Sequence, residues 1–361
     1  MSILSDIKIL MLAPCLGKFG GIETFCLTLA EDLIKKGAFV QLLRKKVNGF
    51  QEDGSIDQNE SEVRLSWTTE ESKRFRSEFV KPRDGIIKNA IKECDLVHLH
   101  NPMIEGAWIS KKFRKPCVMT IYNWKRKGLH PRLWAWKWAV SNADRRWYIS
   151  EFVWNSWEKN KRKNSSRLPV VSRMPSGEIA CNYRKGFLFI GRWIPRKGIR
   201  ILLQAYMQIS PCPKTWPLVM LGDGPLRADV LATIKDSGIK GVDLPGFVTG
   251  SERHRYTREA KWMITPPHTK EDLVLSPLEA RSVGVPCIAS VDGGVKETAG
   301  PHALLCKPGD VDSLAKCLKM AIKMSDEQYE DMSRLAKEHL EQYVRPLDEY
   351  ANEYRKLLNL E

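Results

Sequence analysis

The chain has 361 residues, 43% of them hydrophobic, and a formal net charge of +15. This length predicts two domains, and the charge indicates an anionic partner, a nucleotide or phospholipid before a nucleic acid, because no nucleic-acid-binding motif accompanies it. No apolar run is long enough to span a bilayer, and Asp6 and Lys8 interrupt the apolar run that a signal peptide would need. The nine cysteines have no CxxC or His-paired spacing, which favours reduced thiols over disulfides or a metal site.

The N-terminal segment has the pattern of a strand, a helix and a second strand. Residues 7–14 form an apolar run typical of a buried parallel strand, and a glycine-containing loop follows at 17–21. Apolar residues then recur with helical spacing over 22–36, and the next strand is predicted over 39–43. This order predicts a βαβ unit. The loop does not match GxGxxG, so a dinucleotide site is only weakly indicated.

Two segments lack a clear hydrophobic period. Residues 46–80 are polar and mixed in charge, and we interpret them as a variable insertion that carries one short strand over Glu62 to Trp67. The stretch from Pro169 to Lys185 contains Pro, Ser, Gly and Asn, which is typical of a linker. It predicts the boundary between the two domains.

Two histidines lie on a strand predicted over 95–100. His98 and His100 alternate with apolar residues and therefore share one face of that strand. A metal site is not expected from them, because the sequence offers no third ligand nearby. The strand ends at Asn101, and strand ends in this type of sheet line the binding crevice, so His100 and Asn101 are better candidates for a cleft than His98.

Aromatic and basic residues dominate the next part of the chain. A strand that begins at Cys117 runs into a loop at Tyr122, and tryptophan and basic residues are then dense from Trp134 to Lys163. Amphipathic segments of this composition suit a membrane interface or a lipid-linked, polyanionic acceptor. A tryptophan-rich helix packed in the N-terminal domain, with a solvated basic face, explains the same pattern. The sequence leaves both explanations open.

The second half restarts with a strand that ends at Gly191. Arg192 and Lys197 flank the turn into a helix predicted to begin near Lys197. Such a strand-to-helix turn suits an anion, because a helix N-terminus presents free N–H groups. Arginine offers a planar fork to phosphate oxygens and lysine a point charge. Further strands are predicted over 217–221, before a Gly-Asp-Gly-Pro turn, and over 242–248.

The stretch from Thr265 to Gly294 organises the second half. Glu271 and Glu279 stand eight positions apart, and Pro277 between them is tolerated only in the first turn of a helix. A helix should therefore begin near residue 275, with Ser276 as its candidate N-cap, and end near residue 284. Glu271 then precedes the helix, where a diphosphate would bind. Glu279 lies one turn inside and can accept hydrogen bonds from vicinal hydroxyls, as on a ribose.

These motifs resemble those of the retaining GT-B glycosyltransferases of family 4, the glycosyl transferases group 1. The two glutamates match the family's E-x7-E motif, residues 191–198 match G-R-x4-K-G, and the strand before residue 222 ends in the family's GDGP turn. One departure is that Leu273 and Val274 replace the usual Phe-Gly after the first Glu. The resemblance covers nearly the whole chain and is strongest over 187–308.

The resemblance implies an α/β fold of GT-B type, with two Rossmann-like domains facing across a cleft. We expect an acceptor domain over 1–175, a nucleotide-sugar domain over 176–342 and a C-terminal helix over 343–361 that crosses back to the first domain. The implied activity is a retaining, metal-independent transfer of sugar from a nucleotide-diphospho-sugar of UDP or GDP type. The implied acceptor is a hydroxyl of a glycan, of a lipid-linked molecule or of a small molecule, and the implied process is cell-surface polysaccharide synthesis. No cofactor is implied beyond this donor.

The resemblance also implies roles for individual residues. Three residues are candidates for catalysis: Glu271, Arg192 and Lys197. The donor is expected to contact Gly191, Arg192, Lys197, Gly222, Phe247, Glu271, Val274, Leu275 and Glu279. The cleft and acceptor side is expected to include Gly20 and Gly21, in a loop that resembles the family's GGxE, together with His100, Asn101 and Tyr122. Tyr122 stands where the family commonly has histidine, and tyrosine, with a pKa near 10, is a poor general base at neutral pH.

Two other classes of function fit parts of the same pattern. A non-catalytic GT-B protein that binds nucleotide or glycan is suggested by Tyr122 and Val274, and a GT-B phosphorylase would use phosphate as acceptor in place of a hydroxyl. An NAD-dependent dehydrogenase is not indicated, since GxGxxG with a following acidic residue is absent. The expected location is the cytoplasm, with peripheral contact at the inner face of the cell membrane through Trp134 to Lys163.

Overall fold

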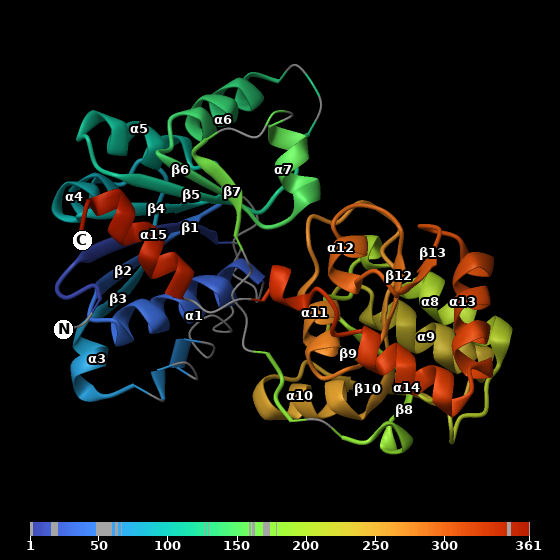
Figure 1. The fold of residues 1–361 in the computed structure, drawn as a ribbon. Helices are drawn as coiled ribbons and strands as arrows, with labels where there is room; N and C mark the ends of the chain where they lie inside the picture. The colour runs from blue at the N-terminus through green and yellow to red at the C-terminus, as the bar shows by residue number, and fades with distance from the viewer. Residues whose placement is uncertain are drawn as a thin grey trace. The chain divides into compact units, whose positions relative to one another are not determined.

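The computed structural model describes residues 3–15, 21–47, 60, 61, 64, 65, 67–126, 128, 130–158, 160, 163–168, 174–177, 179–344 and 348–360. The chain divides into two compact units (Figure 1). Unit 1 comprises Met1–Arg173 and Val344–Glu361, and unit 2 comprises Met174–Tyr343. The sequence placed these boundaries after residues 175 and 342. Both units are α/β with a parallel sheet, as the Rossmann-like interpretation predicted.

Unit 1 is built on a seven-stranded parallel sheet of order β3-β2-β1-β4-β5-β6-β7. The strands are β1 Lys8–Cys15, β2 Phe39–Lys46, β3 Phe75–Val80, β4 Leu96–His100, β5 Cys117–Ile121, β6 Arg145–Tyr148 and β7 Ser165–Arg167. The central strands β4 and β5 are buried along their whole length, as expected for apolar runs covered by helices on both faces.

Seven helices of unit 1 accompany this sheet in the described ranges: α1 Gly21–Lys35, α3 Thr69–Lys73, α4 Gly85–Glu93, α5 Ile104–Lys112, α6 Pro131–Ser141, α7 Glu151–Trp157 and α15 Asp348–Leu358. The C-terminal helix α15 belongs to this unit although it follows unit 2 in sequence. Its Tyr350 and Tyr354 are buried, and the Tyr354 hydroxyl bonds to His98 Nδ1 at 2.6 Å. Tyr350 packs edge-to-face against Trp147 of β6.

One prediction for unit 1 was wrong, and one pair of alternatives is partly resolved. The strand expected over Glu62 to Trp67 is wrong: the described residues of that stretch are helical, turn or irregular, and the edge strand is β3. The tryptophan-rich stretch is not one amphipathic surface. Trp147 and Trp154 are buried, whereas Trp134 is 68% exposed. Burial of large rings in β6 and α7 supplies core volume that the composition alone could not assign.

Unit 2 has a six-stranded parallel sheet of order β10-β9-β8-β11-β12-β13. Its strands are β8 Lys185–Ile190, β9 Leu218–Leu221, β10 Val242–Gly246, β11 Ala260–Thr265, β12 Cys287–Ser290 and β13 Leu304–Cys306. Its α-helices are α8 Ile199–Ile209, α9 Arg227–Ser237, α10 Gly250–Glu259, α11 Leu275–Ser282, α12 Val295–Ala299, α13 Val311–Lys323 and α14 Asp326–Leu335. One apolar core joins β8, β9 and β11 to α8 and α13.

Helix α11 begins and ends close to the positions that Pro277 and Gly284 predicted for its two ends. It runs from Leu275 to Ser282, with Pro277 as its third residue, and Gly284 follows in the left-handed region at φ +71°. The N-cap prediction was wrong. Val274 occupies the N-cap position and Ser276 lies inside the first turn, where its hydroxyl caps no N–H group. The preceding loop, not a side chain, therefore sets the start of this helix.

All nine cysteines are free thiols, as their scattered spacing predicted. Within the described ranges, no helix combines the length and the apolar character that crossing a membrane requires.

Candidate active site

The strand order of unit 2 indicates where a ligand binds. The order β10-β9-β8-β11-β12-β13 reverses direction between β8, the first strand, and β11, the fourth. In open parallel sheets, ligands bind beyond the carboxyl ends of the strands at such a switch point. The loops that meet there follow β8 at Gly191 and β11 at Pro266. Both loops carry residues that the sequence singled out.

Two close backbone approaches fix these loops. A Cβ on Gly198 would lie 1.8 Å from the Pro266 carbonyl oxygen, and the Gly198 φ of +73° is in the left-handed region. A Cβ on Gly294 would lie 2.0 Å from the Asp272 carbonyl oxygen, and the Gly294 N–H donates to the Glu271 carbonyl at 2.8 Å. Only glycine fits at these positions, so the backbone around Glu271 is held between two neighbouring loops.

Lys197 and Glu271 form a mostly buried ion pair at the switch point. Lys197 Nζ donates to Glu271 Oε2 at 3.0 Å, and the Lys197 and Glu271 side chains are 16% and 4% exposed. Arg196 Nε lies 3.6 Å from the other oxygen, Oε1, which makes no hydrogen bond within the described part of the chain. Burial lowers the pKa of the Lys197 ammonium, the Glu271 carboxylate opposes this shift, and the positive charges of Arg196 and Arg192 add to it. An arriving anion would stabilise the charged amine.

The other predicted donor contacts of this edge lie on adjoining loops. The Gly191 N–H donates to the Leu221 carbonyl at 3.1 Å, and the Gly222 N–H donates to the Gly246 carbonyl at 2.7 Å. The ends of β8, β9 and β10 are thereby joined by backbone hydrogen bonds. Arg192 is exposed beside this junction, and Phe247, directly after β10, is 56% exposed. An exposed cation and an exposed ring therefore lie at this edge of the sheet.

The start of α11 supplies backbone donors. Val274 is buried at the N-cap position, and Leu275 is the first helical residue. Val274 has no side-chain atom that could cap this helix, and a helix start of this kind presents N–H groups to an anion. Ser276 is buried, and its hydroxyl lacks a hydrogen-bond partner among the described residues.

Glu279 is the second carboxylate of the motif and lies inside α11. Its side chain is 5% exposed, and Arg253 of α10 donates from Nη2 to its Oε2 at 2.5 Å. Each carboxylate of the motif is thus matched with its own basic side chain, Lys197 for Glu271 and Arg253 for Glu279. The loop position of one and the helical position of the other agree with the sequence prediction.

Three of the predicted cleft residues of unit 1, His100, Asn101 and Tyr122, are joined by hydrogen bonds, and His100 and Tyr122 are buried. His100 Nδ1 shares a hydrogen bond with the Tyr122 hydroxyl at 2.9 Å, and Asn101 Oδ1 accepts from the Tyr122 N–H at 2.9 Å. Burial lowers the pKa of His100 to about 3 and raises that of Tyr122 well above its usual value. Gly21 is the first residue of α1, and Gly20 lies outside the described residues.

Two family models match the chain one after the other. "Glycosyltransferase Family 4" matches residues 19–173, and "Glycosyl transferases group 1" matches residues 182–339, so that together they span both units. The chain belongs to the glycosyl transferases group 1. The second match includes all the donor-site residues described for unit 2. The motifs that were predicted to face phosphate therefore lie on the sheet edge that strand order selects.

Relatives and solved structures agree with this family. An uncharacterised glycosyltransferase of Methanocaldococcus jannaschii is 24% identical over 72% of this chain and 75% of its own length. The O-antigen chain mannosyltransferase B of Escherichia coli is 34% identical over 36% of this chain and 34% of its own length. The crystal structure of Anabaena HepE with UDP and glucose covers 98% of this chain and 100% of that chain, with a TM-score of 0.70 and 16% identity. The chain is a GT-B glycosyltransferase related to enzymes of polysaccharide synthesis.

Two basic residues of this group 1 glycosyltransferase were missed by the sequence interpretation. Arg196 directly precedes Lys197 in the G-R-x4-K-G motif, and its adjacency was a signal that could have drawn attention. Arg253 gave no such signal, because it lies 26 residues from Glu279 on a different helix.

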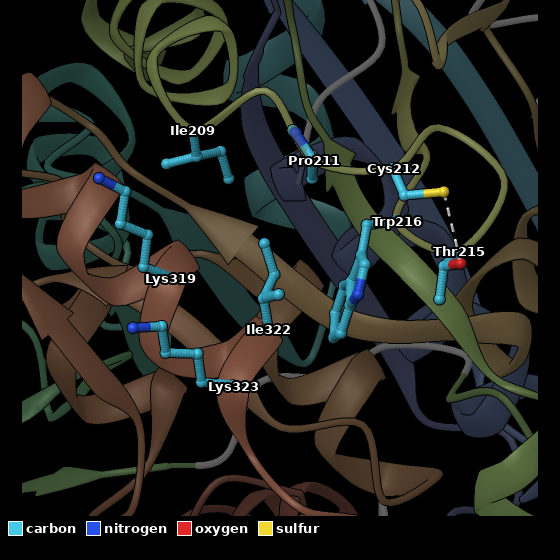
Figure 2. A pocket seen from close by; sticks show the side chains of 8 residues that line it. All are labelled: Ile209, Pro211, Cys212, Thr215, Trp216, Lys319, Ile322 and Lys323. Atoms are coloured by element: carbon cyan, nitrogen blue, oxygen red, sulfur yellow. Dashed lines mark hydrogen bonds between the residues drawn. The ribbon is translucent and has the colours of Figure 1, made fainter.

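A groove of about 330 Å³ in unit 2 lies away from these residues (Figure 2). It is lined by Ile209, Pro211, Cys212, Thr215, Trp216, Lys319, Ile322 and Lys323. Thr215 and Trp216 stand three and two residues before β9, so the groove lies at the amino edge of the sheet, opposite the carboxyl edge where the motifs meet. It contains no predicted site residue.

Proposed function

We propose that this glycosyltransferase takes sugar from a UDP- or GDP-type nucleotide-diphospho-sugar and transfers it, with retention of the anomeric configuration and without a metal ion, to a hydroxyl acceptor. The observation that carries the proposal is the carboxyl edge of unit 2, where Arg196 and Lys197 lie by the buried Glu271 carboxylate and the exposed Arg192 lies in the same loop. This edge offers fixed positive charge and free helical N–H groups to a diphosphate. The bound UDP named for the Anabaena structure supports a nucleotide donor.

The chemistry that these groups support is departure of a charged leaving group. As the bond from sugar to phosphate breaks, negative charge grows on the diphosphate. Arg192, Lys197 and the start of α11 are placed to stabilise it electrostatically, and groups fixed in advance need not reorganise. The departing phosphate oxygen then takes the acceptor proton on the same face of the sugar. That course needs no protein nucleophile, and the proposal assigns none.

Glu271 and Glu279 take different parts in this proposal. Glu271 faces the transferred sugar, where positive charge develops at the anomeric carbon, so its carboxylate stabilises the transition state more than the ground state. Its Oε1 makes no hydrogen bond within the described residues, and we propose that it accepts one from a sugar hydroxyl. Glu279 accepts hydrogen bonds from the ribose hydroxyls, which are made equally in both states. These roles predict a separation of effects on turnover and on donor affinity.

The acceptor is proposed to be a glycan or lipid-linked molecule that binds unit 1. Binding of this acceptor brings the enzyme to an anionic membrane surface. Helices α5 and α6 are adjacent, and their exposed residues include Trp108 and Trp134, which are 54% and 68% exposed. Lys112 lies 5.1 Å from the Trp108 ring and Lys137 lies 5.9 Å from the Trp134 ring. The one acidic residue of these two helices, Glu105, is 19% exposed and forms an ion pair with Lys45. Amphipathic rings beside lysines suit an anionic interface.

Steady-state kinetics with a screened donor tests the proposed function. UDP-, GDP- and ADP-sugars are offered with and without acceptor, and the product anomer is read by NMR with and without EDTA. Glu271→Gln should lower kcat more than it raises the donor KM, whereas Glu279→Gln should mainly raise KM. If both variants only raise KM, the role given to Glu271 is wrong. An inverted product would refute retention, and a donor inert to transfer and hydrolysis would refute the choice of donor.

A further inference from the structure

Arg253 is a basic residue of unit 2 that lies outside the motifs quoted for the sequence. It lies near the start of α10, and its Nη2 donates to Glu279 Oε2 of α11 at 2.5 Å. The Glu279 side chain is 5% exposed, whereas that of Arg253 is 31% exposed. A buried carboxylate without a matching charge is strongly unfavourable. The guanidinium therefore compensates a charge that burial alone would disfavour.

The backbone of α10 fixes the base of the Arg253 side chain. The Arg253 N–H donates to the Thr249 carbonyl at 3.2 Å, and the Thr257 hydroxyl donates to the Arg253 carbonyl at 2.9 Å. Arg253 Nε is buried and makes no hydrogen bond within the described ranges, so the inner part of the guanidinium is enclosed by protein. Helix α10 begins three residues after the exposed Phe247. Arg253 thus links the helix after the β10 loop to the carboxylate inside α11.

We propose that Arg253 is a positioning residue for the nucleotide. By holding the Glu279 carboxylate in one orientation, it makes the enzyme prefer a ribonucleoside diphosphate donor over its 2′-deoxy counterpart. This inference rests on the proposed function, in which Glu279 accepts hydrogen bonds from the ribose. It adds a residue from another helix and a preference within the donor class.

Hydrogen-bond capacity makes the two contacts of Glu279 compatible. An ionised carboxylate accepts only, and its two oxygens offer about four lone-pair sites, so a guanidinium and hydroxyl groups can be accepted together. A ribose presents two vicinal hydroxyl donors, and a 2′-deoxyribose presents one. A carboxylate turned away from the sugar would lose the benefit of the second hydroxyl. Removal of Arg253 should therefore weaken the ribonucleotide more than the deoxynucleotide.

The direction of the effect separates positioning from competition. If Arg253 competed with the sugar for Glu279, its removal would free the carboxylate and tighten nucleotide binding. If Arg253 bound the diphosphate or the base directly, its removal would weaken both nucleotides equally. Only the positioning role predicts weaker binding that depends on the 2′-hydroxyl.

Nucleotide titration of the purified enzyme and four variants tests this inference. The probes are UDP, GDP and ADP with their 2′-deoxy counterparts, and the variants are Arg253→Gln, Arg253→Lys, Glu279→Gln and Arg255→Gln. Arg255 is the matched control, because it is 47% exposed on the same helix and pairs with Glu252 and Glu259. Melting temperatures confirm that each variant is folded, and Arg253→Lys, which keeps the charge, should lie between the parent and Arg253→Gln.

We expect Arg253→Gln to weaken the ribonucleotide about three- to tenfold and the 2′-deoxynucleotide less than twofold, with Arg255→Gln like the parent for both. The inference is overturned if Arg253→Gln weakens both nucleotides equally, weakens neither or tightens binding. If Arg253→Gln does not fold, the inference is overturned when Arg253→Lys gives no ribose-dependent loss. In these cases a ribose-dependent loss in Glu279→Gln leaves the proposed function intact. If Glu279→Gln has no such loss, the ribose assignment fails and the inference fails with it.

Discussion

The sheets of unit 1 and unit 2 reverse their strand order at the same point, between the first and fourth strands, but the described residues at the ends of those strands differ in charge. In unit 2 the loops carry Arg192, Lys197 and Glu271, with a buried ion pair. In unit 1 the corresponding strand β4 ends in His100, which is buried, neutral and hydrogen-bonded to Tyr122. A shared topology therefore specifies where a ligand can bind, and the side chains specify which ligand it can be.

This difference explains why we assign the charged donor to unit 2 alone. Taking a diphosphate out of water is favourable only where opposite charges and oriented N–H groups replace its hydration. The edge of unit 2 offers both. The His98 and His100 rings, 4.1 Å apart in the core of unit 1, carry no charge at neutral pH and offer neither.

Replacement of Lys197 should give the largest loss of activity, because the charged edge of unit 2 is the feature that unit 1 lacks. Lys197→Ala removes a charge-assisted bond worth about 1.5–3 kcal/mol, so donor turnover should fall about tenfold or more. Lys319→Ala is the control, since this lysine lines the groove at the opposite sheet edge (Figure 2). Kinetics under identical donor concentrations provide the measurement. Parent-like turnover in purified Lys197→Ala would remove unit 2 as the phosphate site.

Acid should destabilise unit 1 through its buried histidines. The folded-state pKa of His100 is about 3, below the usual 6.5, so the unfolded chain binds a proton between these values that the folded chain does not. Stability is therefore present above pH 6.5 and is lost as the pH falls. Between pH 7 and 5, His100 should account for about 2 kcal/mol of lost unfolding free energy. Chemical denaturation of the parent and of His100→Asn at both pH values measures this.

The asparagine variant cannot titrate in this range, so it should lose about 2 kcal/mol less than the parent between pH 7 and 5. Equal losses in the two proteins would mean that His100 is accessible to protons in the folded state. Unit 1 would then not be the neutral partner in the comparison.

The smallest expected effect concerns the α5–α6 face of unit 1. Anionic vesicles should bind the enzyme more than neutral vesicles do, and salt should weaken the binding. The double variant Trp108→Ser with Trp134→Ser should reduce flotation with anionic vesicles. Trp147 is not replaced, because its side chain is buried. Each surface lysine near such vesicles contributes about 1 kcal/mol, so Lys112→Gln and Lys137→Gln should reduce it further. Equal flotation of parent and variants would place membrane contact elsewhere.

The sequence predicted local features better than tertiary ones. Pro277 and Gly284 located α11 because proline and glycine act through backbone geometry, which does not depend on the rest of the fold. Ser276 was misassigned as a cap because Val274 and the loop held by Gly294 determine where the helix starts. The strand expected at Glu62 to Trp67 failed because a polar stretch without period gives little information on pairing, which depends on the neighbouring strand β2.

The site shows the same division. Motif spacing indicated Lys197 and Glu271, and the structure adds that they form an ion pair. Arg253 could not be predicted, since its contact with Glu279 depends on how α10 packs beside α11. The burial of Trp147 could likewise not be predicted, because a tryptophan-rich and basic composition also suits a membrane surface.

A crystal structure with UDP or GDP bound would show directly where the donor binds. We expect the diphosphate at Arg192, Lys197 and the start of α11, with the ribose hydroxyls on Glu279. Both nucleotides should be tried, because the donor base is part of the proposal. A nucleotide bound instead at His100 of unit 1, or in the groove beside Trp216, would contradict the assignment of the donor site to the charged edge of unit 2.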